Sequence, residues 1–243
     1  MTGVSQGNPA GLISLGDEAA VKELLTGTVF DLWQIVNNLT RLRPTRRERY
    51  RVTIFGSARA KPGTIAYTET KRCARALTEL GCDILTGGGP GLMQAANEGA
   101  CEADPGDARQ SVGIRIALPF EQSANPFVEQ SFTHETFFTR LHHFVLASDA
   151  FIVAPGGIGT VLEAMMIWQL LQVGHLEKMP FLMVGKMWPG LVEWARKEML
   201  SFDPPLANAE DMDLPRCVPT ADEAIAVIRE HHAHWLQGRA ASR

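Results

Sequence analysis

The sequence predicts an α/β fold: a Rossmann-like, doubly wound parallel sheet with helices on both faces, preceded by an N-terminal helical extension. Two observations favour it. From residue 51 onward, short runs of β-favouring residues alternate with stretches of helical periodicity. Several of these runs end directly in glycine, as strands do where they turn over the carboxyl edge of a parallel sheet.

The N-terminal region is expected to differ from the rest of the chain. Residues 1–16 are rich in Gly, Ser, Pro and Asn and lack periodicity, so they are predicted to form a mobile arm. Apolar residues at helical spacing predict an amphipathic helix, or two, over residues 17–42. An arginine-rich segment with Pro44 follows, and we favour a solvated linker over an anion or partner site.

The core elements are predicted in alternating order. The expected strands are VTIFGSA from Val52, CDILTGG from Cys82, SVGIRIAL from Ser111, AFIVAPGG from Ala150 and PFLMVG from Pro180. Helices are expected near residues 65–80, 91–102, 135–147, 159–173, 188–200 and 221–235. Residues 17–236 then form a single Rossmann-like nucleotide-binding domain that includes the N-terminal helix, and residues 237–243 form a tail.

Composition limits the classes of partner. The formal net charge of −4 provides no positive field for nucleic acid. No stretch reaches the roughly 18 apolar residues that a membrane helix needs. The four cysteines lie far apart without a CxxC pair, which favours a reduced compartment. We therefore expect a cytoplasmic protein with a small-molecule substrate and neither a nucleic-acid nor a membrane partner.

Two glycine loops predict an anion site. GGGPG spans residues 87–91 and PGGIGT spans residues 155–160. A glycine loop that opens a helix can aim backbone N–H groups at a phosphate, although tight turns also use glycine for packing alone. Neither loop is a Walker A motif, and the GxGxxG fingerprint is absent, which argues against ATP hydrolysis and NAD-linked redox chemistry. The candidate substrate-binding residues in and around these turns are Ser57, Arg59, Gly88, Gly89, Gly156, Gly157, Gly159 and Thr160.

The spacing after the second glycine loop indicates Glu163 as a candidate catalytic carboxylate. It lies three residues after Thr160, about one helical turn on, where it can face an anion held by the loop. The alternative is an ordinary acidic residue in the first turn of a helix, favoured by the helix dipole.

The segment PGGIGTVLE, residues 155–163, resembles the PGGxGTxxE signature of the LOG (Lonely guy) family, formerly mislabelled as lysine decarboxylases. The resemblance extends to GSAR from Gly56, GGGPGLMQAAN from Gly87, LPFE from Leu118 and SDAFIVAPGG from Ser148. It covers most of residues 51–199, and the helices at both ends are similar to those of the larger LOG type.

The resemblance implies a reaction and two catalytic residues. Family members cleave the N-glycosidic bond of cytokinin riboside 5′-monophosphates, and often of AMP, to give the free base and ribose 5-phosphate. Their Arg-Lys pair matches Arg140 and Leu141 here, so the arginine is present and the lysine is replaced. Glu121, in LPFE, matches a family carboxylate near the nucleotide. The resemblance also implies a homodimer or higher homo-oligomer, and the apolar face of the helix over residues 17–42 is a candidate interface.

The expected chemistry gives each candidate a role. Cleavage of a ribosyl–base bond passes through an oxocarbenium-like sugar, which Glu163 can stabilise or supply with an oriented water. Arg140 stays protonated and suits electrostatic stabilisation or a fork that holds Glu163 or the base. Met93 and Asn97 are candidates for contacting ribose or base, with a core position the alternative for Met93. No metal or organic cofactor is expected; a pyridoxal phosphate enzyme would need a lysine beside the crevice, and none is found there.

The sequence leaves alternatives open for the roles of the histidines and for the function of the chain. We expect structural roles for His142 and His143, and a solvated helix end for His231, His232 and His234. Three functions remain: a phosphoribohydrolase acting on N6-prenylated nucleotides, an AMP nucleosidase in purine salvage, and a non-catalytic nucleotide or cofactor carrier with the same fold.

Overall fold

The structure, a computed structural model, describes residues 16–39, 48–104, 106, 108, 110–117, 123–176 and 179–241. Two compact units are distinguished, Met1–Thr45 and Arg46–Arg243. The expected mobile arm, residues 1–16, lies outside the described residues except for Gly16, as do the arginines at positions 41, 43, 46 and 47. No helix in the described ranges is long and apolar enough to cross a membrane.

The first unit contains helix α1 (Glu18–Leu39), close to the predicted bounds. Asp17 receives a 3.1 Å hydrogen bond from the backbone N–H of Ala20 through Oδ1, as an N-terminal capping residue does. Several large apolar side chains of α1 are exposed: Leu24, Leu25, Val29, Phe30 and Leu32. The helix therefore presents apolar surface that contacts within the first unit do not cover.

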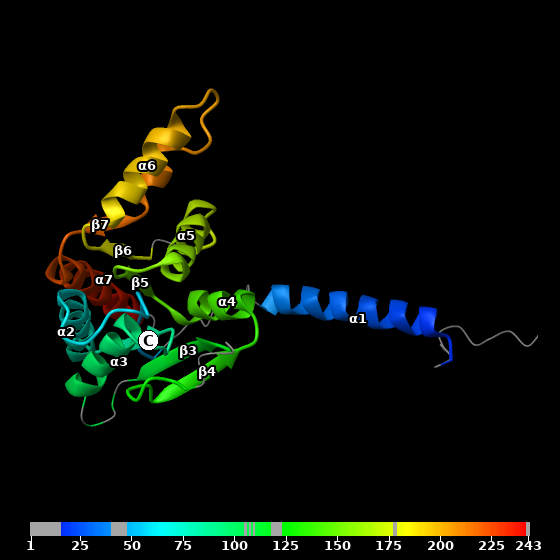
Figure 1. The fold of residues 1–243 in the computed structure, drawn as a ribbon, viewed down its shortest axis with the longest axis horizontal. Helices are drawn as coiled ribbons and strands as arrows, with labels where there is room; N and C mark the ends of the chain where they lie inside the picture. The colour runs from blue at the N-terminus through cyan, green and yellow to red at the C-terminus, as the bar shows by residue number, and fades with distance from the viewer. Residues whose placement is uncertain are drawn as a thin grey trace, which may run out of the picture. The chain divides into compact units, whose positions relative to one another are not determined.

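The second unit is built on a seven-stranded, fully parallel sheet with the order β4-β3-β2-β1-β5-β6-β7. The chain runs outward from β1 to β4 and returns to place β5 beside β1 (Figure 1). The strands are β1 (Arg51–Phe55), β2 (Asp83–Thr86), β3 (Ser111–Ile116), β4 (Gln130–His134), β5 (Ala150–Val153), β6 (Phe181–Val184) and β7 (Arg216–Val218). Strand order therefore reverses between β1 and β5, which defines the switch point of a doubly wound sheet.

Helices cover both faces of the sheet, as predicted. One face carries α2 (Ile65–Glu79), α3 (Leu92–Ala103) and α7 (Ala221–Ala241), and the other carries α4 (Phe137–Ala147), α5 (Ile158–Gln172) and α6 (Trp188–Leu200). A short 3₁₀ helix, η1 (Ala209–Asp213), precedes β7. The fold is the predicted α/β Rossmann-like architecture.

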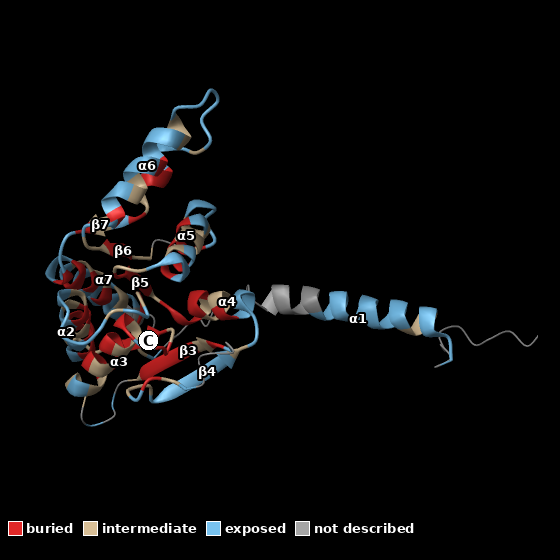
Figure 2. Ribbon diagram, in the orientation of Figure 1, coloured by how far each residue is buried: buried red, intermediate tan, exposed pale blue. Residues whose placement is uncertain are grey.

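Alternation along the strands divides the core into two layers. In β1, Ile54 packs toward α2 and α7, whereas Phe55 packs toward α4, where its ring meets Phe144 edge-to-face and lies parallel to Phe151 of β5. Figure 2 shows buried residues in strands such as β3 and on parts of these helices, whereas the edge strand β4 is drawn as exposed. Because every central strand is covered on both faces, its residues read as a continuous apolar run and not as an alternation.

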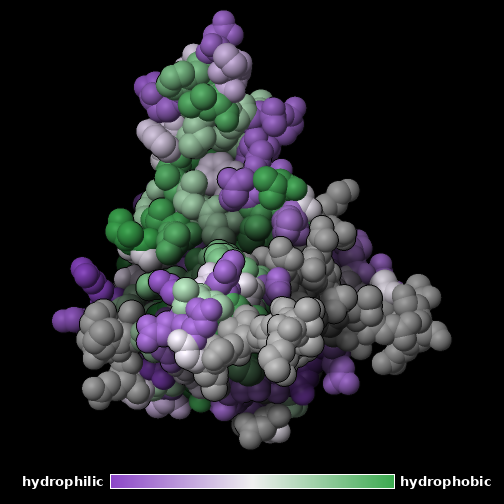
Figure 3. All heavy atoms as spheres, turned by 90° about the vertical axis from the view of Figure 1, so that its right-hand side faces the viewer, coloured by the Kyte–Doolittle hydropathy of each residue, from purple (hydrophilic) through white to green (hydrophobic). Residues whose placement is uncertain are grey.

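Some apolar surface of the second unit remains exposed. Ile158, Leu162 and Val173 of the α5 region and Trp194 of α6 have at least 46% of their surface exposed. Figure 3 shows apolar side chains gathered over the upper part of one face, where Figure 1 places α5 and α6.

The structure differs from the sequence prediction at both edges of the sheet. Strands β4 and β7 were not predicted; β4 is QSFTH, largely exposed, and β7 has three residues. Neither carries the buried apolar run that identifies a central strand, because each has a neighbour on one side only. Helix α7 continues to Ala241, past the predicted end at residue 235 and through most of the expected tail.

The C-terminal histidines also differ from expectation. The solvated helix end expected for His231 and His232 is wrong, because both pack against the buried Tyr50. The Tyr50 hydroxyl lies 2.7 Å from Nδ1 of His231, and His232 is 7% exposed. Through these contacts, α7 packs against Tyr50, the residue that precedes β1.

Candidate active site

Three glycine turns meet at the switch point. The backbone N–H of Ser57, after β1, donates to the carbonyl oxygen of Pro155, after β5, over 3.1 Å. The N–H of Leu92, which opens α3 after β2, donates to the carbonyl oxygen of Ser57 over 2.8 Å. The turns after β1, β2 and β5 therefore form one assembly at the carboxyl edge of the sheet, where open α/β sheets bind ligands.

The N-terminus of α5 is open to a ligand. The helix begins at Ile158 with Gly157 as its N-cap, and no side chain caps it. Gly157, Ile158 and Gly159 are exposed, while Thr160 is buried against Gly156. Because the first N–H groups of a helix have no partner within it and carry the positive end of its dipole, this turn can hold a phosphate.

Arg140 and Glu163 meet behind that turn. Nη1 of Arg140, on α4, donates to Oε1 of Glu163, on α5, over 3.0 Å, and each residue is 8% exposed. The guanidinium is held further by a 2.9 Å hydrogen bond from Nε to the carbonyl oxygen of Ile114 on β3. It also lies 5.1 Å from the ring centre of Phe144. A buried charge needs such partners, so the pair is fixed by three elements of the fold.

Burial changes the acidity of Glu163. Desolvation raises the pKa of its carboxyl group to about 7, and the charge and hydrogen bond of Arg140 oppose that shift. A carboxyl group with a pKa near neutrality can exchange a proton at working pH, as general acids and bases do. Glu163 therefore has an acidity suited to chemistry, unlike that of an ordinary first-turn glutamate.

Gly87 allows the guanidinium to approach the second glycine loop. A Cβ atom there would lie 2.5 Å from Nη2 of Arg140 and 2.6 Å from Sδ of Met93. Only glycine leaves room for both groups at this point. The loop after β2 therefore forms a wall of the Arg140–Glu163 site, with half-buried Met93 beside it.

Asn97 lies beneath the same loop. Its side chain is fully buried, accepts a hydrogen bond from Thr86 Oγ1 over 2.7 Å and donates to Ser111 Oγ over 2.8 Å. Asn125 donates to Oδ1 of Asn97 and to the carbonyl oxygen of Gly89, both over 3.0 Å. The expected contact of Asn97 with ribose or base is therefore corrected to support of the glycine loop, because its polar atoms are enclosed by this network.

The other candidates are distributed around the edge. Ser57 is half-buried, and its Oγ accepts from the N–H of Arg59, which is exposed. Gly88 and Gly89 are buried within the loop and, as glycines, contribute only backbone atoms to it. Glu121 lies outside the described residues.

Sequence reasoning missed His134, which ends β4. Its Nε2 lies 2.9 Å from Nδ1 of His143, and its Nδ1 lies 3.0 Å from Oγ1 of Thr139. Burial and the charge of Arg140 lower the pKa of His134, which favours the neutral imidazole. The contact with His134 agrees with a structural role for His143, which stays a prediction. The sequence did not single out His134, because the strand that positions it, β4, was not predicted.

Among the described residues, no three His, Cys, Asp or Glu side chains are grouped as a metal site would require. What the edge does offer is an open helix N-terminus, two glycine loops and a buried Arg–Glu pair. A parallel sheet with these features at its switch point defines an α/β protein of the Rossmann-like class.

A family model described as "Possible lysine decarboxylase" matches residues 93–228, more than half of the chain. The chain belongs to this family, the LOG family. Met93, Arg140 and the PGGIGT loop with Glu163 lie inside the matched range, whereas Ser57 and GGGPG precede it. The LOG-type fold supports a nucleotide-related role. No curated protein matches the chain significantly.

Solved structures share the fold at low sequence identity. The molybdenum cofactor binding protein of Rippkaea orientalis is 18% identical with a TM-score of 0.57, and the alignment covers 77% of this chain and 98% of that one. The molybdenum cofactor carrier protein of Chlamydomonas reinhardtii is 17% identical with a TM-score of 0.57, covering 76% and 99%. DNA processing protein A of Helicobacter pylori is 16% identical with a TM-score of 0.50, covering 75% and 81%. These similarities show the fold alone.

Proposed function

We propose that the chain is an N-glycosyl hydrolase that cleaves a purine nucleoside 5′-monophosphate to the free base and ribose 5-phosphate. The observation that carries this proposal is the buried Arg140–Glu163 pair, with its 3.0 Å hydrogen bond, directly behind an uncapped helix N-terminus. Such an arrangement has both parts that the reaction needs: an anion site for the 5′-phosphate and a carboxylate near the sugar.

In this mechanism the phosphate binds the N–H groups of Gly157, Gly159 and Thr160 at the start of α5 and accepts a hydrogen bond from the hydroxyl of Thr160. Phosphate binding then fixes the ribose against Glu163. The ionised carboxylate stabilises the oxocarbenium-like sugar or orients the attacking water. Arg140 holds that carboxylate through Nη1 and places Nη2 beside Gly87 and Met93, where it can stabilise charge on the departing base. Neither step calls for a metal or an organic cofactor.

The proposal is tested by product release. The purified chain is expected to release adenine and ribose 5-phosphate from AMP or from N6-isopentenyl-AMP, measured by chromatography. Glu163→Gln is expected to bind the nucleotide with similar affinity and to lose at least about a hundredfold in kcat. Glu193→Gln, the same substitution at an exposed position of α6, is the matched control and should retain activity. If neither nucleotide is cleaved while Glu163→Gln and the unchanged chain bind it equally, the hydrolase proposal is wrong.

A specific observation favours a carrier as the second candidate. Leu141 stands where family members have a lysine, so one cation of the family site is missing. Two proteins of this fold are described as binding or carrying the molybdenum cofactor, and that description supports a carrier as an alternative role for this chain. Tight nucleotide binding without turnover, in the unchanged chain, would support this candidate.

The cellular setting is part of the proposal. The four cysteines lie far apart in the sequence without a CxxC pair, and Cys73 and Cys82 are buried, which is typical of a protein in a reducing compartment. We therefore place the enzyme in the cytoplasm, with purine salvage or cytokinin activation as its pathway. Relative kcat/KM values for AMP and the prenylated nucleotide distinguish these pathways.

A further inference from the structure

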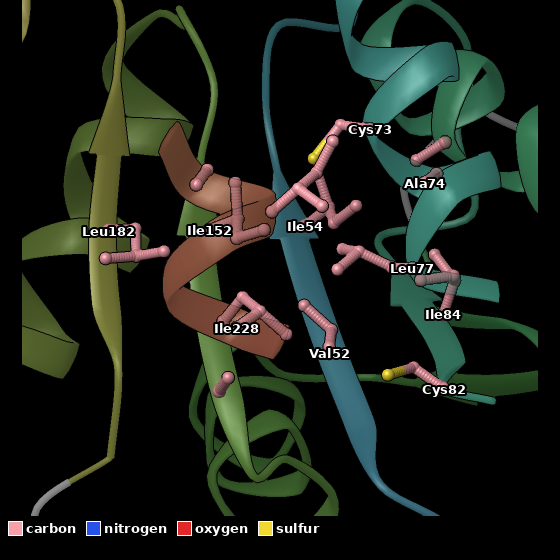
Figure 4. Packing of buried hydrophobic residues seen from close by; sticks show 14 of the residues in the cluster. Val52, Ile54, Cys73, Ala74, Leu77, Cys82, Ile84, Ile152, Leu182 and Ile228 are labelled. Atoms are coloured by element: carbon pink, nitrogen blue, oxygen red, sulfur yellow. The ribbon is translucent and has the colours of Figure 1, made fainter. Parts of the chain in front are cut away.

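A cavity lies at the same sheet edge, on the other face from Arg140 and Glu163. It has a volume of about 500 Å³ and lies between α2 and the start of α7. Its floor is formed by Ile54 of β1 and Ile152 of β5, the two strands that flank the switch point. Figure 4 shows both side chains on the side of the sheet that α2 covers, with Cys73 above them. The cavity therefore occupies the position where doubly wound sheets bind ligands, but on the face opposite the Arg140–Glu163 pair.

The walls of this cavity are almost entirely apolar. Ala66 and Ile65 of α2 close one side, and Val184 of β6 with Pro219 closes the other. Burial raises the pKa of the Cys73 thiol to about 12, so this group is a neutral, weakly polar part of the wall. Such a surface favours an aliphatic or aromatic group over a charged one.

Two of the polar residues that line the cavity, Glu69 and Thr220, have side-chain partners. Glu69 forms a 2.7 Å ion pair with Arg72, and Oγ1 of Thr220 donates to Glu223 over 3.3 Å. Because the carboxylate of Glu69 is paired with the guanidinium of Arg72, the rim offers no unpaired charge from Glu69 to an ionic ligand. The chemistry of the rim therefore points to an uncharged ligand.

The cavity shares one wall with the PGGIGT loop, residues 155–160. Pro155 lines the cavity, and its carbonyl oxygen accepts the hydrogen bond from Ser57 that joins the loops of the candidate active site. Gly185, with φ of +103°, brings the turn after β6 to this wall, where a Cβ atom would lie 3.4 Å from Pro155. An occupant of the cavity would therefore touch the residue from which the PGGIGT loop starts.

We propose that this cavity is a binding site for a small, uncharged aliphatic group of about five to ten carbons. An apolar cavity of about 150 Å³ is sufficient for benzene, so the space here accommodates a larger group. The inference does not depend on the proposed hydrolysis, because it rests on a separate cavity and is tested by binding. The aliphatic group belongs either to a free small molecule or to a substituent on the nucleotide.

The test uses straight-chain alcohols from ethanol to octanol as probes. Each added methylene is expected to raise the affinity about fourfold until the cavity is filled, after which the affinity levels off. In methyl NMR spectra, hexanol is expected to shift the signals of Ile54 and Ile152. The signals of Ile114 and Ile167, on the opposite face of the sheet, should not move. Absence of a chain-length dependence, or shifts confined to Ile114 and Ile167, would overturn the proposal.

Matched variants localise the site. Ala66→Phe places a ring in the cavity and should weaken hexanol binding by at least about tenfold. Ala76→Phe, the same substitution on the same helix but outside the cavity, should leave hexanol binding unchanged. Val184→Phe fills the cavity from β6 and serves if Ala66→Phe does not fold. Equal hexanol binding by the unchanged chain and by a folded filling variant contradicts the site.

Kinetics distinguish the two sources of the aliphatic group. If the group is part of the nucleotide, hexanol and Ala66→Phe should raise KM for N6-isopentenyl-AMP and leave KM for AMP unchanged. If the ligand is a free molecule, both nucleotides should respond alike, whether or not there is an effect. A chain that binds alcohols at Ile54 and Ile152 but cleaves neither nucleotide would refute the proposed function and retain this inference.

Discussion

At the scale of single residues, Glu163 combines deep burial with a cationic partner. Those two influences act on its pKa in opposite directions, and desolvation dominates, so the carboxyl group has a pKa of about 7. A group in this state affects both activity and stability across the neutral range. The candidate catalytic residue can therefore be examined by changing pH alone.

We expect kcat to rise with pH and to reach half its maximum near pH 7, because the proposed mechanism uses the ionised carboxylate of Glu163. The measurement is kcat for AMP between pH 5 and pH 9 at saturating substrate. A rate that is flat from pH 5 to pH 7 would show that ionisation of Glu163 does not limit the reaction.

Stability should change with pH in the opposite sense. Because the pKa of Glu163 is higher in the folded chain than the usual 4.5, folding favours its protonated form, and stability from this group is lost as pH rises from 4.5 to 7. The unfolding free energy of the unchanged chain, relative to Glu163→Gln, should fall by up to about 3 kcal/mol over this window. Urea denaturation of both proteins at pH 5 and pH 8 measures the difference, and a difference that is independent of pH would contradict the raised pKa.

Gly87 is expected to be needed for the position of Arg140. Gly87→Ala places a Cβ atom 2.5 Å from Nη2, so the guanidinium must move; kcat should fall at least about tenfold, with a stability cost of about 1–3 kcal/mol. Gly190→Ala is the control, because nothing lies within 4 Å of its added methyl group on α6. That variant should keep its activity and gain about 0.5–1 kcal/mol in unfolding free energy. Full activity of Gly87→Ala would show that the Arg140 position tolerates displacement.

At the scale of elements, the turn into α5 joins binding to catalysis. It exposes the helix N-terminus at Gly157 and, about one turn after Thr160, directs Glu163 inward to Arg140 on α4. Helix geometry relates the two functions, since three residues advance a helix by nearly one turn. A change confined to the first turn should therefore affect phosphate binding more than chemistry.

Thr160→Val tests this division of roles. Valine keeps the shape that packs against Gly156 and removes only the hydroxyl donor. We expect KM for AMP to rise about tenfold to a hundredfold with little change in kcat, because a hydrogen bond to a charged group is lost. Thr68→Val, at an exposed position of α2, is the control. An equal loss of kcat and kcat/KM would place Thr160 in the chemical step.

At the scale of the whole molecule, the exposed apolar residues of α1 are the feature with a consequence for assembly. Leu25 and Val29 are 60% and 63% exposed and are separated by one helical turn. Apolar surface of this kind commonly marks an interface, and closed homodimers are the commonest assemblies. We propose that α1 contributes to a homodimer contact.

The chain is expected to sediment as a dimer, and Leu25→Lys with Val29→Lys is expected to weaken the dimer at least about a hundredfold, since each buried aliphatic side chain contributes about 1.5–3 kcal/mol. Glu23→Lys changes charge on the same helix without removing apolar surface and is the control. Sedimentation velocity at several concentrations measures the change. A monomeric unchanged chain, or a double variant that dimerises equally well, would exclude α1 as the contact.

The sequence by itself determined the parts of this protein that depend on local signals. The five central strands, the six helices of the second unit and the glycine turns after β1, β2 and β5 follow from periodicity and from strand ends. The position of Glu163 about one helical turn after Thr160 of the PGGIGT loop follows from helix geometry alone. These features are local because each is set by residues within one or two turns of each other.

Only the tertiary structure decided how the elements meet. Arg140 reaches Glu163 across 23 residues of chain because the strand order brings α4 and α5 onto one face. Asn97 becomes enclosed because Thr86, Ser111 and Asn125 converge on it from separate segments. Strand β4 and the cavity above Ile54 and Ile152 also depend on neighbours far along the chain. Contacts of this kind arise from packing among distant elements, which residue periodicity does not encode.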